Sequence, residues 1–268
     1  MLVPYIHAQT DDFAVIYKPP LMHCAPLSRS EKGKSQTEVN LDQIENYSSC
    51  TLLDWYARIF PVVLNISGKK PGEGGLLHRL DFHTQGLVLF AKNQKTYDFL
   101  SAEQEQGSFI KEYQALCFNP DSTVLSSSPG FPPCPMKLTG APMIIESYFR
   151  SFGPGRKEVR PVIDSDHCHR KISADKGAFY KTEICSVKEL ESTKESDIYH
   201  KKYLFDLRIK RGFRHQIRCH LAWIGYPIIN DPVYSHIQAK EAGFLALFSK
   251  GLLFRSPDNI IREYRITT

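Results

Sequence analysis

The chain has 268 residues, of which 42% are hydrophobic, so it can bury a full core and is most simply one domain that can have two lobes. Its formal net charge of +5 is compatible with a polyanionic partner but identifies none, because many basic proteins bind no nucleic acid. No apolar run reaches the roughly 20 residues needed to cross a bilayer, and Met1–His7 has no features of a secretory signal. The seven cysteines form no Cys-x-x-Cys pair, which indicates reduced thiols in a cytoplasmic protein.

The expected helices and strands follow from the pattern of apolar residues. Phe13–Tyr17 is an apolar run typical of a strand. Thr51 is expected to cap a helix that has Asp54 at its third position and stops at Pro61, and Asn93–Gln106 is expected to be a second helix. Polar, Gly-rich or Pro-rich stretches are expected to be connections: Ser28–Asn40, Gly68–Gly75, Ser126–Pro135 and a charged hairpin tip over Glu191–Lys202. Many strands with few helices, in no strict alternation, indicate an α+β fold.

An Arg-x-Asp pair stands directly ahead of another expected strand. Leu87–Ala91 is an unbroken apolar run, which is typical of a strand buried on both faces. Asp81, with Arg79 beside it, lies at the start of that strand, where a carboxylate is costly to bury without a cationic partner. Folds keep such an acid mainly where it does chemistry. The alternative is a surface Arg/Asp turn capped by Thr84.

A second segment offers a cationic partner. Tyr203–Lys210 alternates apolar and polar residues, as does a strand with one buried face. From Ile217 onward apolar residues recur four and then three apart, which predicts a helix with one apolar stripe. Arg214 and Arg218 are expected on one side of its first turns. Two arginines there oppose the helix macrodipole and need an anion to face, whereas the alternative is a solvated basic helix face.

These motifs together resemble the RluA-type pseudouridine synthases. The resemblance rests on His-Arg-Leu-Asp-x-x-Thr-x-Gly-Leu-x-Leu-Phe-Ala-Lys from His78, and on His-Gln-Ile-Arg-x-His-Leu-Ala-x-Ile-Gly-x-Pro-Ile from His215, followed by Asp-Pro-Val-Tyr. It extends from about Asp11 to at least Tyr234. The fold that it implies is a mixed, largely antiparallel central sheet with flanking helices and a catalytic cleft across the sheet.

The resemblance implies an RNA pseudouridine synthase, an isomerase that modifies a specific uridine of ribosomal or transfer RNA. Asp81 would be the catalytic carboxylate, Arg218 its ion-pair partner, and Tyr113 the residue against the uracil ring that removes the C5 proton. Arg79 would hold the RNA open, with a salt bridge to a neighbouring acid as the alternative. Phosphates would be met by three further residues: Lys18, Arg214 and His215. Because the reaction is an intramolecular isomerisation, no cofactor or metal is expected.

The resemblance also bears on organisation and partners. Residues 1–268 are expected to form a single catalytic domain that acts on RNA as a monomer. Because the first expected strand begins at Phe13, no separate N-terminal RNA-binding domain is expected, and specificity would come from the catalytic domain itself.

The chain departs from the family pattern at several positions. The family usually has Gly-Arg-Thr or Gly-Arg-Ser where this chain has Gly212-Phe213-Arg214. We expect Phe213 to pack inward or against a base, while Arg214 meets a phosphate from another direction. Gln85 stands where serine is usual, and Asn230 stands where glycine is usual.

Two other functions are compatible with the sequence. One is a non-catalytic RNA-binding or ribosome-assembly protein on the same fold, against which the joint presence of Asp81, Tyr113 and Arg218 argues. The other is a metal-dependent hydrolase built on Asp164–His169. Adjacent ligands in so short a run seldom reach one tetrahedral centre, so no metal site is expected.

Overall fold

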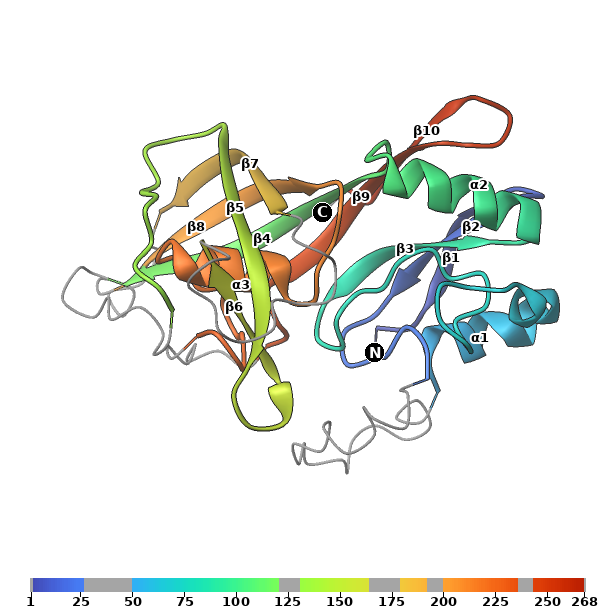
Figure 1. Ribbon diagram of the computed structural model, residues 1–268, viewed down its shortest axis with the longest axis horizontal. Coiled ribbons are helices and arrows are strands. Elements are labelled where there is room, and N and C mark those ends of the chain that lie inside the picture. Colours follow the sequence, from blue (N-terminus) through green and yellow to red (C-terminus); the bar gives the residue numbers. More distant parts are fainter. Residues whose placement is uncertain are drawn as a thin grey trace. The chain divides into compact units, whose positions relative to one another are not determined.

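The computed structural model (Figure 1) describes residues 2–26, 50–120, 131–163, 179–191, 200–235 and 243–267. The chain divides into two compact units: unit 1 is Met1–Ile110 with Ser249–Thr268, and unit 2 is Lys111–Phe248. That residues 1–268 act as one domain stays a prediction. Among the described residues, no helix is both long enough and apolar enough to span a membrane.

Unit 1 is built on a sheet in which two neighbouring strands are buried on both faces. Its strands, in spatial order, are β1 (Tyr5–Gln9), β2 (Phe13–Lys18), β3 (Gln85–Ala91), β9 (Leu247–Arg255) and β10 (Ile261–Arg265). The unit also contains α1 (Leu52–Ile59), the short 3₁₀ helix η1 (Pro61–Asn65) and α2 (Gln94–Glu105). Figure 1 shows this sheet in blue and cyan with β9 and β10 in red.

Local hydrogen bonds explain where the two helices of unit 1 begin. The Thr51 hydroxyl accepts from the Asp54 amide at 3.2 Å, and the Asp54 carboxylate accepts from the Thr51 amide at 3.0 Å, so α1 starts with a capping box. α1 ends before Pro61. The Asn93 side chain caps α2 by accepting from the Thr96 amide at 2.8 Å. Both predicted helices are confirmed.

β3 requires a glycine at its start. Gly86 has a φ of +123°, and a Cβ at this position would lie 2.2 Å from the Ser249 carbonyl oxygen of β9. A larger residue would push the two strands apart. Leu87–Ala91 is 0% exposed at every position, so the predicted strand buried on both faces is confirmed.

Unit 2 is a second antiparallel arrangement. Its strands, in spatial order, are β4 (Ile110–Pro120), β8 (His200–Ile209), β7 (Tyr180–Leu190), β5 (Met143–Phe152) and β6 (Glu158–Val162). The 3₁₀ helix η2 (Pro154–Arg156) joins β5 to β6, and α3 (Gln216–Trp223) packs against β6 and β7. The predicted α+β class, with mixed and largely antiparallel strands, is confirmed.

The prediction for α3 needs a correction. All eight residues of α3 are buried, so the helix has no solvated face. His215 has a left-handed backbone with φ 56°, and the helix starts only after it, at Gln216. Arg214 therefore precedes the helix while Arg218 lies inside it. The two arginines do not share an exposed side, because the helix starts later than the motif suggested and every residue in it is buried.

Several predicted connections lie outside the described residues. These are Ser28–Asn40, most of Ser126–Pro135, most of the Glu191–Lys202 tip and the Asp164–His169 cluster.

Candidate active site

Asp81 lies in a tight turn immediately before β3 in unit 1. The Thr84 amide donates to the Asp81 carbonyl at 3.1 Å, which closes the turn. On the preceding residue, the Leu80 amide donates to Cys24 Sγ at 3.2 Å, and the Cys24 thiol lies 3.5 Å from the Leu80 carbonyl oxygen, to which it donates. The backbone around Asp81 is therefore held on both sides. The Asp81 residue is half-buried.

Lys18 supplies another link to this turn from the end of β2. Its ammonium donates to the carbonyl oxygens of Pro19 at 2.9 Å, Met22 at 2.8 Å and Phe82 at 3.3 Å. The first two belong to the loop after β2, and Phe82 belongs to the Asp81 turn. Lys18 thus joins the two loops through hydrogen bonds to main-chain oxygens.

The Lys18 side chain is buried, and burial changes its pKa. The residue is 0% exposed, and burial lowers its pKa to about 8, against the opposing attraction of Cys24 and Asp81. The ammonium has three donors, and they are directed to three carbonyl oxygens. In this structure Lys18 positions the Asp81 turn, and the phosphate contact predicted for it stays a prediction.

Arg79, next to this turn, is held by an acid. Its Nη1 lies 3.1 Å from Glu73 Oε1. The arginine side chain is 34% exposed, whereas the glutamate side chain is 10% exposed. The salt bridge considered as the alternative for Arg79 is thus present, and a role in opening RNA stays a prediction.

Arg218, in unit 2, forms a buried pair with Asp231. Its Nε and Nη2 donate to the two carboxylate oxygens, each at 2.8 Å, and the side chains are 2% and 0% exposed. Burial disfavours the charged carboxylate, but the hydrogen bonds and charge of Arg218, with the amides of Val233 and Tyr234, hold the pKa of Asp231 below its ordinary value. The pair is therefore ionised and fixes the direction of the guanidinium.

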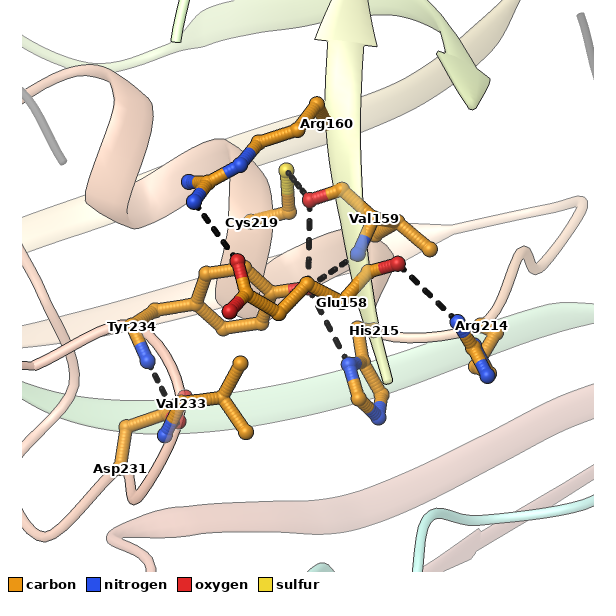
Figure 2. Close-up of polar contacts among 9 residues, drawn as sticks. All are labelled: Glu158, Val159, Arg160, Arg214, His215, Cys219, Asp231, Val233 and Tyr234. Atoms are coloured by element: carbon orange, nitrogen blue, oxygen red, sulfur yellow. Dashed lines mark hydrogen bonds and ion pairs between the residues drawn. The ribbon is translucent and has the colours of Figure 1, made fainter. Parts of the chain in front are cut away.

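The loop that carries Asp231 is shaped to present this carboxylate. Asp231 Oδ1 accepts from the Val233 amide at 2.9 Å and from the Tyr234 amide at 3.1 Å (Figure 2). The preceding Asn230 has φ 59°, a left-handed conformation that asparagine tolerates better than most residues. This explains how asparagine can stand where the family usually has glycine.

A second network joins α3 to β6, as Figure 2 shows. The Tyr234 hydroxyl accepts from the Val159 amide at 2.9 Å and lies 3.1 Å from His215 Nδ1. Cys219 Sγ lies 3.5 Å from the Val159 carbonyl oxygen. Burial raises the pKa of Tyr234, so its hydroxyl stays protonated. His215 is thus placed by a tyrosine, and its predicted phosphate contact stays a prediction.

Phe213 and Arg214 depart from the family pattern, and their side chains have different environments: Phe213 contacts aromatic rings, whereas Arg214 is exposed. The Phe213 ring stacks on Phe149, with centroids 5.1 Å apart, and lies 5.0 Å from the Tyr180 ring. The predicted inward packing of Phe213 is confirmed. Arg214 is exposed, and its Nη2 donates to main-chain carbonyls of the β5–β6 connection.

Two further residues of the same motif are structural, and sequence reasoning did not single them out. Gln216 Nε2 donates to the Lys181 carbonyl at 2.9 Å. The His220 ring lies 2.9 Å from the Thr182 hydroxyl and 3.0 Å from the Ser147 hydroxyl. Burial lowers the pKa of His220 to about 3, so the ring is neutral. These residues anchor α3 on β7 and β5.

Asp231 and Cys24 were also missed. A signal existed for Asp231, because an acid in a segment with apolar neighbours needs a cation when it is buried. No such signal in the sequence existed for Cys24, because its sulfur binds the main-chain amide and carbonyl of Leu80, which is distant from Cys24 in the sequence.

Tyr113 lies in β4, opposite Leu207 of β8, and is 5% exposed. Asp81 belongs to unit 1, whereas Tyr113 and Arg218 belong to unit 2. The predicted contacts of Asp81 with these two residues stay predictions. No group of three or more metal-ligating His, Cys, Asp or Glu side chains occurs in the described part of the chain, and Asp164–His169 lies outside it.

A solved structure supports the class of fold. Human RNA pseudouridylate synthase domain containing 1 aligns over 99% of this chain and 84% of its own, with a TM-score of 0.60 and 16% sequence identity. This similarity shows that the chain has the pseudouridine synthase fold.

The sequence itself places the chain in a family. The family described as RNA pseudouridylate synthase matches residues 12–223, so the chain belongs to this family, and the RluA-type resemblance is confirmed. The mitochondrial tRNA pseudouridine(32) synthase of Saccharomyces cerevisiae is 28% identical over 161 residues, which are 59% of this chain and 27% of that protein. Ribosomal large subunit pseudouridine synthase D of Borreliella burgdorferi is 26% identical over 166 residues, 61% of this chain and 39% of that protein. The chain spans less than half the length of either relative.

Proposed function

We propose that this chain is an RNA pseudouridine synthase that isomerises a specific uridine of ribosomal or transfer RNA, with Asp81 as its catalytic carboxylate. The observation that carries the proposal is the family match over residues 12–223, which includes Asp81, Tyr113 and Arg218. The named activities of the two relatives support ribosomal and transfer RNA as the substrate classes. We further propose that the protein acts as a monomer in the cytoplasm. The free thiols of the cysteines in the described residues support a reducing compartment.

The reaction breaks the N1–C1′ bond of uridine, turns the base and rejoins it through C5. Glycosidic cleavage builds positive charge at C1′, and a carboxylate is suited to stabilise or attack that carbon. Asp81 would either attack C1′ or remove a ribose proton, and both steps require the ionised form. The turn held by Lys18 and Cys24 supports this role, because a catalytic group acts best from a fixed direction.

The remaining residues would bind and complete the reaction. Tyr113 would lie against the uracil, with its hydroxyl removing the C5 proton. Arg218, already oriented by Asp231, would pair with Asp81. Extruding the base from its stack costs a few kcal/mol. Arg79 would enter the vacated space after leaving Glu73.

The test is Asp81→Asn, with Asp98→Asn as the control because Asp98 lies on the exposed face of α2. The substrate is RNA from cells lacking the gene, labelled with tritium at uracil C5, since the C5 hydrogen leaves during the reaction. We expect Asp81→Asn to release tritium about 10²–10⁴-fold more slowly than the parent while binding RNA equally well. Parent-like release by Asp81→Asn would rule out the assigned carboxylate. No release by the parent from any RNA fraction would rule out the function.

A further inference from the structure

Positive charges gather on the hairpin formed by β5, η2 and β6. Arg156 and Lys157 at its tip are exposed, and Arg150 on β5 is half-buried. In the described part of the chain, none of these three has an acidic partner. Arg214 adds a fourth charge beside them. We call Arg150, Arg156, Lys157 and Arg214 the basic hairpin surface.

Arg214 holds the tip in place without losing its charge. Its Nη2 donates to the Arg156 carbonyl at 2.5 Å and to the Glu158 carbonyl at 3.1 Å, and Figure 2 shows the second of these bonds. Carbonyl oxygens satisfy the donors but do not neutralise a guanidinium. Arg156 itself has φ 55°, a left-handed conformation that these bonds help to maintain. The tip is therefore both preorganised and positively charged.

The base of the hairpin keeps two arginines face to face. Arg150 of β5 pairs directly with Arg160 of β6, and like charges at such positions normally destabilise a sheet. Arg160 is offset by Glu158 at 2.6 Å and by the Phe131 and Phe152 rings, whose centroids lie 4.4 Å and 4.6 Å from its Cζ. The Arg150 guanidinium also stacks on Phe152, at 5.2 Å.

Two exposed lysines of unit 2, Lys181 and Lys201, are arranged differently. Lys181 lies 2.9 Å from Glu146, and Lys201 lies 2.7 Å from Glu189. These two lysines are neutralised locally, whereas no acid among the described residues forms an ion pair with a cation of the basic hairpin surface. A surface of unpaired arginines and a lysine on a fixed backbone suits a partner with regularly spaced anions. Arginine in particular binds phosphate in bidentate geometry.

We propose that the basic hairpin surface binds the phosphate backbone of the substrate RNA. This inference rests on the proposed function and adds to it the surface by which unit 2 holds RNA outside the reacting nucleotide. Because the contacts are to phosphates, they contribute affinity and register rather than chemistry.

The test removes the two tip charges and keeps the tip conformation. Arg156→Asn with Lys157→Gln is suitable, because asparagine tolerates the left-handed backbone. The control is Lys181→Gln with Lys201→Gln, which removes the same charge from paired positions of unit 2. Binding to bulk tRNA and bulk rRNA from cells lacking the gene is measured from low to high salt. Each lost phosphate contact should flatten the plot of log affinity against log salt by about 0.7–0.9, so the hairpin variant should lose roughly 1.4–1.8.

The hairpin variant should also raise KM for tritium release and leave kcat unchanged, because it touches no reacting atom. A parental salt slope in the hairpin variant, or equal flattening in the control, would overturn the proposal. Failure of the proposed function gives a different result. In that case the parent releases no tritium. The salt dependence of RNA binding is measured without catalysis, so it still shows whether the hairpin binds RNA.

Discussion

Replacing Asp231 by asparagine tests how the central arginine is held. The substitution keeps the shape of the side chain but removes the charge of Asp231 from beside the buried Arg218 guanidinium, whose side chain is 2% exposed. It also leaves one oxygen in place of two to accept from the Arg218 guanidinium, because the asparagine amide presents a single acceptor oxygen and a donor NH₂ group.

The expected cost follows from that burial. Breaking a buried ion pair from one side costs about 3–5 kcal/mol, since the remaining charge stays desolvated. Weaker hydrogen bonds from the Val233 and Tyr234 amides add to the loss. For a chain of this size each kcal/mol lowers Tm by about 2–4 °C, so unit 2 should melt roughly 6–20 °C lower.

Thermal unfolding followed by circular dichroism and calorimetry measures the effect. Glu146→Gln, which breaks the exposed Lys181–Glu146 pair of the same unit, serves as the control and should change Tm little. In Arg218→Met with Asp231→Asn, removal of the charge should recover part of the loss. The reasoning is refuted if Asp231→Asn has the Tm of the parent. It is also refuted if the Tm losses of the single variants Asp231→Asn and Arg218→Met add fully in the double variant.

Two further predictions concern the Asp81 turn. The pKa of Lys18 is lowered from 10.5 to about 8, so between these pH values the unfolded chain binds more protons than the folded one. The free energy of unfolding of the parent relative to Lys18→Met should therefore rise from pH 8 to pH 10.5 in denaturant titrations, and a flat or falling difference would contradict the buried ammonium. Cys24→Val removes both hydrogen bonds to Leu80 and should lower kcat about 3- to 10-fold without raising KM. Cys24→Ser, which keeps a donor and an acceptor, should recover most of the loss, and equal kcat values in the two variants would show that Cys24 only packs.

Local chemistry made much of the fold predictable. The caps at Thr51 and Asn93 involve residues three positions away, so they can be recognised in the sequence. The unbroken apolar run of β3 likewise predicts a strand that is buried on both faces. The order of the motifs was enough to predict the family, because each long motif is carried by contiguous residues.

The surroundings of the candidate site were decided by contacts between distant segments. Lys18 meets Phe82, 64 residues away, and Cys24 meets Leu80, 56 residues away. Two of the three carbonyl oxygens that Lys18 binds are close in sequence, but the third, on Phe82, could not be predicted from the residues near Lys18. The resemblance implied a phosphate contact for Lys18, which stays a prediction, while the structure adds that its ammonium joins the loop after β2 to the Asp81 turn.

Arg214 and Arg218 also show which features the sequence predicts and which depend on the tertiary structure. The sequence alone determined that Arg218 lies on a helix, because apolar periodicity is a local property. Only the tertiary structure decided that this helix packs against β6 and β7 with all its residues buried, that Asp231 pairs with Arg218, and that Arg214 binds the β5–β6 hairpin. The physical reason is that the environment of a charge depends on which remote groups surround it after folding, and periodicity carries no information about those groups.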